Sequence, residues 1–475
     1  MTEPCCILSG AYAVETQEEQ PYRWVQSHVE IAVPATGGLL LLNGRSPIGG
    51  RVRAVTCQTA FEIELQADVD VQLRIPVAVG DDQHVSLVFS DSLQVDGDDR
   101  ILCFKLVEMR WQPLPSEPIK AARTVELAFG RGLPGGLVRT VFVLGWLRMC
   151  ARRLSNGDLQ VSGILLSPLR RREPAVLTVN SVSPGNIRHG LFNPDYGFLG
   201  PCAFEGVIPK KIVDSGAIRF GSAYARDGKP ATPWWQDWWF PAPSKLPLPE
   251  GENMRRIGAE KADWFLLGGA SFVGKLPDVL AELGLPNDLR GLNILDWGCG
   301  CGRLTRHLLD MGCHRVTGID IDPVNIAWCK RNLPGAHFQL VNPDLPSGFA
   351  EKQFDLVIAH SVMTHLSELD QYLWLVEINR LLRSGGIAVL TVMGNYSAAI
   401  EHFTPDRYAA LLSSGLLDVG WQNDGVDSQK PGFYRRVFHT ADYISENWSL
   451  YFQLRAILEG YSDHQAGIVL QRVES

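Results

Sequence analysis

The sequence has no excess of basic residues and no pattern of paired cysteines. Its 475 residues include 44 Lys and Arg against 52 Asp and Glu, so the formal net charge is −8. This charge argues against a general nucleic-acid binder, which needs a basic surface to hold phosphates. The 10 cysteines form no Cys-x-x-Cys pair, and we therefore predict reduced thiols and no metal site.

A secretory signal and a long apolar run are also missing. The first residues show no basic region followed by a long apolar segment, so we expect a cytoplasmic protein. The most apolar stretch, "LPGGLVRTVFVLGWLRMCARRL", has an uncharged core far shorter than the ~20 residues that span a bilayer. Two interpretations stay open for it. One is a linker helix packed on a neighbouring domain, and the other is a basic amphipathic helix in which residues 137–154 contact a membrane surface.

The length predicts two or three domains. Residues 1–115 consist of short alternating runs separated by Gly and Asp turns, which predicts a β-sandwich-like module. Residues 116–157 are expected to form a linker with a helix. Residues 158–245 are expected to form a second β-rich module, which ends in the Pro-rich "FPAPSKLPLPEG".

Four tryptophans lie just before this Pro-rich segment, in "PWWQDWWFP": Trp234, Trp235, Trp238 and Trp239. Indole faces stack on sugar rings, so a glycan platform is one interpretation. The other is an aromatic cluster packed between domains, which is the more frequent use of clustered aromatic side chains.

From residue 250 to residue 475 the pattern changes to alternating strands and helices. The runs "LNILDW", "RVTGIDI", "HFQLV", "FDLVIAH" and "IAVLTVMG" are strand-like and are separated by helical segments. This order predicts an α/β doubly wound (Rossmann-like) domain with its ligands at the carboxyl ends of the strands. Residues 395–446 are longer than a minimal connection and leave the fifth strand at that edge. We therefore expect them to form a substrate lid.

The first predicted strand of this domain runs into a glycine loop, "ILDWGCGCGRLTRHLLD". A phosphate-binding P-loop is excluded because no Lys-Ser/Thr pair follows. The dinucleotide pattern G-x-G-x-x-G also fails, because Arg303 or Thr305 stands where its third glycine belongs. What remains is the motif D-x-G-x-G-x-G, formed by Asp296, Gly298, Gly300 and Gly302. Cys299 and Cys301 are expected to be small filler.

An acid, Asp320, ends the next predicted strand, where a carboxylate can accept both hydroxyls of a ribose. With this acid, the glycine loop, the strand "FDLV" and the turn "LLRSGG", residues 250–475 resemble the class I S-adenosylmethionine-dependent methyltransferases. The resemblance implies S-adenosyl-L-methionine as the cofactor. The loop from Asp296 to Gly302 would then lie against its methionine and ribose, Asp320 would bind the ribose, and Ile321 would pack on adenine.

The same resemblance implies two further contacts with the cofactor. Either Asn342 or Asp344, in "LVNPDLP", is expected to meet the adenine amine. Arg255 or Arg256 in "ENMRRIG", or Arg303 after the glycine loop, is expected to pair with the methionine carboxylate. Ion pairs on a domain surface are the alternative for each arginine.

Three histidines are candidates for the base that takes a proton from a hydroxyl acceptor. His360 ends the strand "FDLVIAH", where the transferable methyl should lie, and its alternative is a histidine that caps the strand or touches the cofactor. His439 and His464 come second, and His464 is expected in a terminal β-hairpin.

The ending "FHTADYISENWSLYFQLRAILEGYSDHQ" resembles methyltransferases that accompany bacterial surface-polysaccharide synthesis, and the β-rich front half has a weaker likeness to accessory modules of that setting. These likenesses imply O-methylation of a sugar or glycan hydroxyl. Two alternatives remain: an N- or small-molecule methyltransferase, and a binding or scaffold protein with an inactive methyltransferase fold.

Overall fold

The chain forms two compact units, Met1–Lys120 and Ala121–Glu474. The computed structural model describes residues 5–473 apart from 18–19, 35–37, 57–59, 78–83, 96–97, 114–144, 169–173, 194–201, 260, 343–346, 402 and 422–434. Within these residues, no helix is long and apolar enough to cross a membrane.

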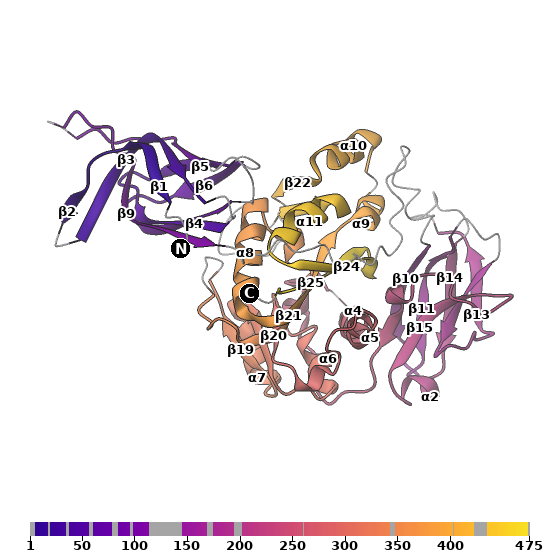
Figure 1. Ribbon diagram of the computed structural model, residues 1–475. Coiled ribbons are helices and arrows are strands. Elements are labelled where there is room, and N and C mark those ends of the chain that lie inside the picture. Colours follow the sequence, from indigo (N-terminus) through magenta and orange to yellow (C-terminus); the bar gives the residue numbers. More distant parts are fainter. Residues whose placement is uncertain are drawn as a thin grey trace. The chain divides into compact units, whose positions relative to one another are not determined.

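The first unit is a sheet of nine strands, drawn in indigo and violet in Figure 1. Seven strands follow the order β6-β5-β8-β3-β9-β4-β7, and β1 and β2 pair with β3. The strands are β1 (Cys6–Ala11), β2 (Glu15–Gln17), β3 (Gln20–Ala32), β4 (Gly38–Arg45), β5 (Gly50–Val55), β6 (Ala60–Leu65), β7 (Asp70–Val77), β8 (His84–Phe89) and β9 (Phe104–Pro113).

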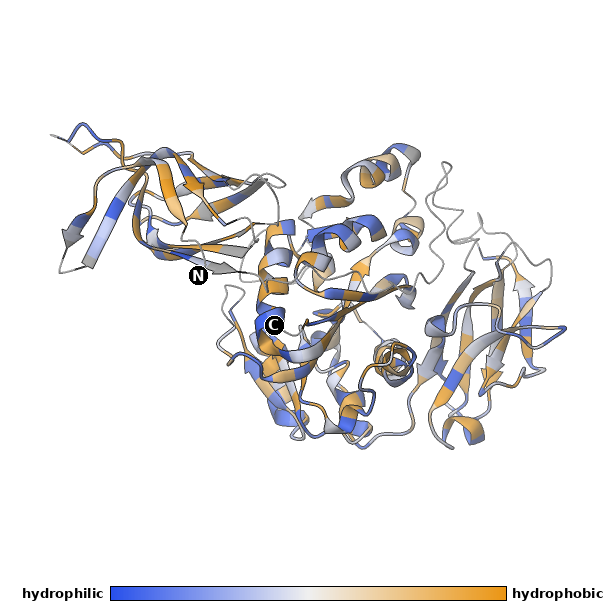
Figure 2. Cartoon of the chain, in the orientation of Figure 1, coloured by the Kyte–Doolittle hydropathy of each residue, from blue (hydrophilic) through white to orange (hydrophobic). Residues whose placement is uncertain are grey.

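Alternation of apolar and polar residues explains why this segment forms strands. In Figure 2 hydrophobic and hydrophilic stretches follow one another along its ribbons. Leu42, Leu73, Val85 and Phe104 are buried, and along β8 buried residues alternate with more exposed ones. The long strand β3 pairs with both β8 and β9, so the pairing is continuous. The predicted strands are confirmed, but a sandwich of two separate sheets is not.

A second β-rich module opens the second unit and consists of two small sheets, β10-β11-β14-β13 and β12-β15-β16. Apolar side chains from both sheets, such as Leu147, Leu177 and Phe220, share one core. The elements are β10 (Trp146–Arg153), β11 (Leu159–Leu166), β12 (Ala175–Val179), β13 (Ile187–Leu191), β14 (Ala203–Ile208), α2 (Lys210–Val213), β15 (Ile218–Tyr224), η2 (Trp234–Gln236) and β16 (Trp238–Phe240).

The prediction of a helix within residues 116–157 is wrong for its described part. Trp146–Arg153 form strand β10, which pairs with β11 along its whole length. Its buried residues, among them Leu147, Met149 and Ala151, alternate with more exposed ones, which is the period of a strand. A membrane-surface helix over 137–154 therefore does not exist at 146–153, and residues 137–144 lie outside the described residues.

The tryptophan cluster packs inside the second unit. Trp238 is 3% exposed and belongs to the core of the β-rich module. Trp234 and Trp235 pack against the core of the following α/β domain, and the Trp239 ring faces the Arg219 guanidinium at 4.9 Å. Packing between domains accounts for these contacts.

The α/β domain contains a sheet in the order β19-β18-β17-β20-β21, and these five strands are parallel. Strand β25 then pairs antiparallel with β21, and β24 pairs with β25 as a hairpin. The strands are β17 (Ile294–Trp297), β18 (Val316–Asp320), β19 (His337–Leu340), β20 (Phe354–Ala359), β21 (Leu382–Met393), β24 (Gln453–Ser462) and β25 (Gln465–Gln471). The predicted Rossmann-like domain and its terminal hairpin are present.

Helices connect and flank these strands, as the ribbons labelled α4 to α8 in Figure 1 show. The helix α7 begins at Pro323, and the side chain of its N-cap residue Asp322 accepts hydrogen bonds from the backbone of Val324 and Asn325. The helices are α3 (Gly251–Arg255), α4 (Ala262–Gly274), α5 (Leu276–Glu282), η3 (Leu289–Gly291), α6 (Thr305–Asp310), α7 (Pro323–Asn332), η4 (Met363–His365) and α8 (Glu368–Leu381).

The expected lid region, 395–446, contains secondary structure of its own. It holds α9 (Asn395–Ile400), α10 (Pro405–Ser414), β22 (Leu416–Trp421), β23 (Arg435–His439) and most of α11 (Ala441–Asn447), which is followed by η5 (Trp448–Leu450). Strand β23 continues the sheet through the pair Met393 and Phe438. Its role as a substrate lid stays a prediction.

A buried glutamine joins the β-rich module to the α/β domain. The Gln236 side chain is 0% exposed, accepts from the Leu147 amide at 3.1 Å and donates to the Tyr396 hydroxyl at 3.2 Å. Tyr396 donates to the Gly145 carbonyl at 2.5 Å and stacks on Trp146. Because these contacts cross between the two parts, the β-rich module is built into the same unit as the α/β domain.

We predict that Gln236→Ala destabilises this unit by about 2–3 kcal/mol, because buried backbone and tyrosine groups lose their partners. The midpoint of urea unfolding, followed by tryptophan fluorescence, measures this change. Gln353→Ala, at an exposed position of the same domain, is the control and should leave the midpoint unchanged. Equal midpoints for both variants would contradict a structural role for Gln236.

Candidate functional site

The glycine loop follows β17 and adopts a backbone that only glycine adopts easily. Gly298, Gly300 and Gly302 have φ angles of 71°, 52° and 79°, which is the left-handed region. A Cβ atom on Gly298 would lie 2.3 Å from Val362 Cγ2, and one on Gly300 would lie 2.5 Å from Ile257 Cγ2. Both conformation and space therefore require glycine in this loop.

Asp296 holds the loop to the helix that follows it. Its carboxylate is 1% exposed and accepts from the Thr305 amide at 3.1 Å and the Thr305 hydroxyl at 2.6 Å. Burial raises the pKa of Asp296 to about 6, against the lowering effect of these hydrogen bonds. The contacts of Asp296 are thus with the start of α6, and its part in the site is to fix the loop.

Asp320 ends β18 directly beside the loop, because β17 and β18 are parallel neighbours. Its Oδ2 accepts from the Gly300 amide at 2.7 Å, and its Oδ1 accepts from the Asp322 amide at 2.8 Å. Burial raises the pKa of Asp320 to about 6. The carboxylate is therefore oriented by two backbone donors and keeps further lone pairs for a ligand.

A contact between Arg303 and His360 joins the segments that follow β17 and β20. Arg303 follows the loop after β17, His360 follows β20, and the guanidinium of Arg303 contacts His360 Nδ1. Burial, together with Arg303 and His464, holds the pKa of His360 well below its usual range. His360 is therefore a neutral histidine beside a cation, which makes it a weak base.

A second histidine, His464, lies in the tight turn between β24 and β25. Its Nδ1 is 2.9 Å from Asp463 Oδ2. Arg148, on β10 of the β-rich module, donates from Nε to Asp463 Oδ1 at 2.7 Å and from Nη2 to Oδ2 at 2.9 Å. Burial alone would raise the pKa of Asp463, but Arg148 and His464 outweigh it and hold the pKa below its usual range.

Whereas the glycine loop and Asp320 are not among the lining residues, Arg303, His360, Asp463 and His464 line one cavity of about 270 Å³ at the carboxyl ends of β17 and β20. Strand order reverses between these two strands, and α/β sheets bind their ligands at such a point. The cavity is lined by Trp238, Arg255, Ile257, Gly258, Trp264, Gly268, Arg303, His360, Ser361, His365, Ser462, Asp463, His464 and Gln465. It thus combines two arginines, three histidines and a carboxylate with indole and aliphatic surface.

The other predicted residues fall in different places. Arg255 lines the cavity and pairs with Glu252 at 2.6 Å, whereas Arg256 pairs with Asp322. Ile321 is half-buried after β18, and Asn342 is exposed after β19. Asp344 lies outside the described residues.

His439 is not part of this cavity. Its side chain is 3% exposed, its Nε2 lies 2.8 Å from Gln371 Oε1, and Tyr443 and Trp448 pack around it. Burial lowers the pKa of His439 to about 3. The structure places it in the packing between β23 and α8, away from the other two histidines.

Sequence reasoning missed several lining residues. Ser361 has a φ of 64°, a strained value for a residue with a side chain, and its hydroxyl accepts from Gln465 at 2.5 Å. Asp463 and Gln465 flank His464 in "SDHQ", so the cluster of polar residues in that turn was the available signal. Arg148 carried no signal, because it lies 315 residues from its partner.

Part of this domain matches a known family model. Residues 295–390, from β17 to β21, match the model described as "Methyltransferase domain". The chain is 30% identical over 160 residues to the ubiquinone biosynthesis O-methyltransferase of Methylobacterium sp. (strain 4-46), covering 28% of this chain and 63% of that protein. It is 37% identical over 106 residues to the ribosomal protein L11 methyltransferase of Tolumonas auensis, covering 21% of this chain and 35% of that one. The chain thus spans less than two thirds of these relatives.

Solved structures also align with part of this chain. The 1,6-didemethyltoxoflavin-N1-methyltransferase of Burkholderia thailandensis aligns with 50% of this chain and 96% of its own, at 18% identity and a TM-score of 0.31. Residues 295–390 thus match a methyltransferase domain, and the glycine loop and the reversal of strand order lie within this matched segment.

We predict that Gly300→Ala lowers the affinity for S-adenosylhomocysteine at least tenfold. The added Cβ meets Ile257 and forces an unfavourable φ next to Asp320. Isothermal titration calorimetry measures the loss. Gly291→Ala is the control, because a Cβ at Gly291 has no neighbour within 4 Å. Unchanged binding by Gly300→Ala would show that the loop does not approach the ligand.

Proposed function

We propose that this protein is an active S-adenosylmethionine-dependent methyltransferase that methylates a hydroxyl group. The observation that carries the proposal is the hydrogen bond from the Gly300 amide to the Asp320 carboxylate. It joins a loop that needs glycine to an acid at the carboxyl ends of β17 and β18, next to the reversal of strand order between β17 and β20. The ribose and the methionine portion of S-adenosylmethionine suit a site made of a close-lying backbone and a carboxylate.

The residues present fit this cofactor. Asp320 offers a carboxylate to two ribose hydroxyls, and half-buried Ile321 follows it as an apolar neighbour for adenine. Arg255 and Arg303 line the cavity and supply positive charge for the methionine carboxylate. Of the two adenine candidates we retain both, Asn342 and Asp344.

When bound, the cofactor supplies an electrophilic methyl group on a sulfonium. In our proposal, Asp463 holds Nδ1 of His464, so that Nε2 takes the proton of the acceptor hydroxyl as its oxygen attacks. We choose His464 over His360 because His464 has this carboxylate partner, whereas burial and the neighbouring Arg303 lower the pKa of His360. The lid segment 395–446 would exclude water.

For the acceptor we propose a sugar or glycan hydroxyl in bacterial polysaccharide synthesis, in the cytoplasm. The half-buried Trp264 lines the cavity and offers apolar surface to a sugar ring, and the buried Trp238 supports it with ring centroids 5.7 Å apart. The support for an oxygen acceptor is that some of the relatives are named O-methyltransferases. The polysaccharide setting rests on the resemblance of the C-terminal sequence.

The test of cofactor binding is calorimetry with S-adenosylmethionine and S-adenosylhomocysteine. We expect micromolar binding by the native chain and a loss of at least 100-fold in Asp320→Ala, because the ribose loses its acceptor. Asp310→Ala, at an exposed site of the same domain, should bind normally. Absence of binding by the native chain would refute the proposed cofactor.

Binding should also depend on pH through Asp320. Its pKa is raised to about 6, so the carboxylate is ionised above that pH and protonated below it. The protonated form accepts hydrogen bonds less well, and the affinity for S-adenosylhomocysteine should fall as the pH drops from 7.5 to 5.5. Asp320→Asn should bind weakly and equally at both values. An equal fall in that variant would assign the effect to another group.

The base is tested by transfer of labelled methyl groups to glycan, lipid and protein fractions. His464→Gln should lower kcat by roughly 100- to 10,000-fold, the contribution of a general base, while S-adenosylhomocysteine binding stays intact. His337→Gln, at an exposed position on β19, should retain full activity. Full transfer by His464→Gln would exclude His464 as the base, and label in protein alone would overturn the glycan acceptor.

A further inference from the structure

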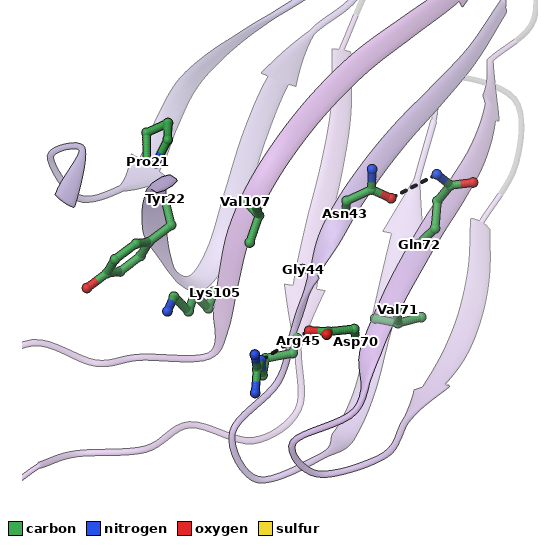
Figure 3. Close-up of a pocket in the computed structure, with 10 residues that line it drawn as sticks. All are labelled: Pro21, Tyr22, Asn43, Gly44, Arg45, Asp70, Val71, Gln72, Lys105 and Val107. Atoms are coloured by element: carbon green, nitrogen blue, oxygen red, sulfur yellow. Dashed lines mark hydrogen bonds and ion pairs between the residues drawn. The ribbon is translucent and has the colours of Figure 1, made fainter. Parts of the chain in front are cut away.

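The first unit carries a cleft of its own. A shallow depression of about 550 Å³ lies on one face of four neighbouring strands, β3, β9, β4 and β7. Figure 3 shows its side chains: Asn43 and Gln72 point toward one another, as do Arg45 and Asp70. None of these groups takes part in the methyltransferase site, which belongs to the other unit.

Strand periodicity explains why polar groups gather here. Leu42, Leu73 and Phe104 are buried, so their neighbours at Asn43, Gln72 and Lys105 face the opposite side of the sheet. The pairing of β4 with β9 shifts register between Asn43 and Gly44. Such an irregularity increases strand bending and twist and often lies beside binding sites.

A chain of hydrogen bonds fixes the amide groups of the cleft. Asn43 donates to Glu108 at 2.7 Å, and Gln72 donates to the Asn43 carbonyl oxygen at 2.8 Å. Arg45 Nε pairs with Asp70 at 3.1 Å. Planar amide, guanidinium and carboxylate groups held in this way present both donors and acceptors. Hydroxyl groups both donate and accept hydrogen bonds, so a ligand rich in hydroxyls matches these side chains.

Charge and apolar surface narrow the class of ligand further. Arg45 pairs with Asp70, and Lys105 is the remaining charged residue of the lining, so the cleft holds no cluster of like charges of the kind that selects for a phosphate or a metal ion. At the other end the Tyr22 ring lies beneath Lys105 Nζ at 4.0 Å and meets Trp24 edge to face. A neutral ring that carries hydroxyls at its edge and apolar C–H groups on its face fits both the polar end of the cleft and the aromatic end.

We propose that this cleft binds a neutral oligosaccharide. Its hydroxyls lie along Asn43, Gln72 and the Arg45–Asp70 pair, and the apolar surface of one sugar ring lies toward Tyr22. Binding at this cleft needs neither cofactor nor methyl transfer, so this proposal is tested independently of the function of the second unit.

The experiment uses the full-length protein, without cofactor, on an array of neutral oligosaccharides of glucose, mannose, galactose and N-acetylhexosamines and of acidic ones with uronic or sialic acid. We expect saturable binding to a neutral oligosaccharide, followed by calorimetry with the best ligand of the array. Binding to no neutral oligosaccharide, or to acidic ones alone, overturns the proposal.

Variants then test the location of the binding site. Gln72→Ala and Asn43→Ala should each weaken binding about 5- to 10-fold, the effect of a lost hydrogen bond. Gln94→Ala, an exposed glutamine outside the cleft, is the matched control and should bind as the native chain does. Gln72 is itself exposed, so its replacement leaves the core intact. Native affinity in both cleft variants would exclude this cleft as the binding site.

Discussion

A largely buried ion pair between Arg148 and Asp463 connects the β-rich module to the candidate active site. The two side chains are only 22% and 10% exposed, and the guanidinium donates to both carboxylate oxygens. Such a pair compensates the cost of removing charges from water only when its geometry is good, and losing one partner is costly. The hairpin turn that carries His464 therefore depends on a residue of β10.

The remaining contacts of the β-rich module act in the same direction. Gln236 and Trp235 reach the Glu459 carbonyl on β24, and Lys275 reaches the carbonyls of Trp235 and Tyr461. Strand β24 leads directly into the turn with Asp463. The β-rich module thus supports the hairpin beside the cavity, and its Trp238 ring also lines the cavity.

Much of the α/β domain could be predicted because its signals are local. Gly298, Gly300 and Gly302 indicate a left-handed backbone conformation, which other residues rarely adopt. Asp322 followed by Pro323 indicates the start of a helix. The segment of β10 was predicted as a helix because it continues an apolar run that ends at Leu147 and carries basic residues, which together are typical of an amphipathic helix. Pairing with β11, rather than local preference, decides the conformation of such a run.

The sequence by itself determined the order of strands and helices in the α/β domain, the glycine loop and the acid at the end of β18. These follow from periodicity, from the stereochemistry of glycine and from spacing over a few residues. Only the tertiary structure decided which histidine meets a carboxylate. His439 and His464 look alike in the sequence, but folding buries one against Gln371 and sets the other beside Asp463 and Arg148. Contacts between residues hundreds of positions apart leave no local pattern in the sequence, because the two partners meet only when the chain between them has folded.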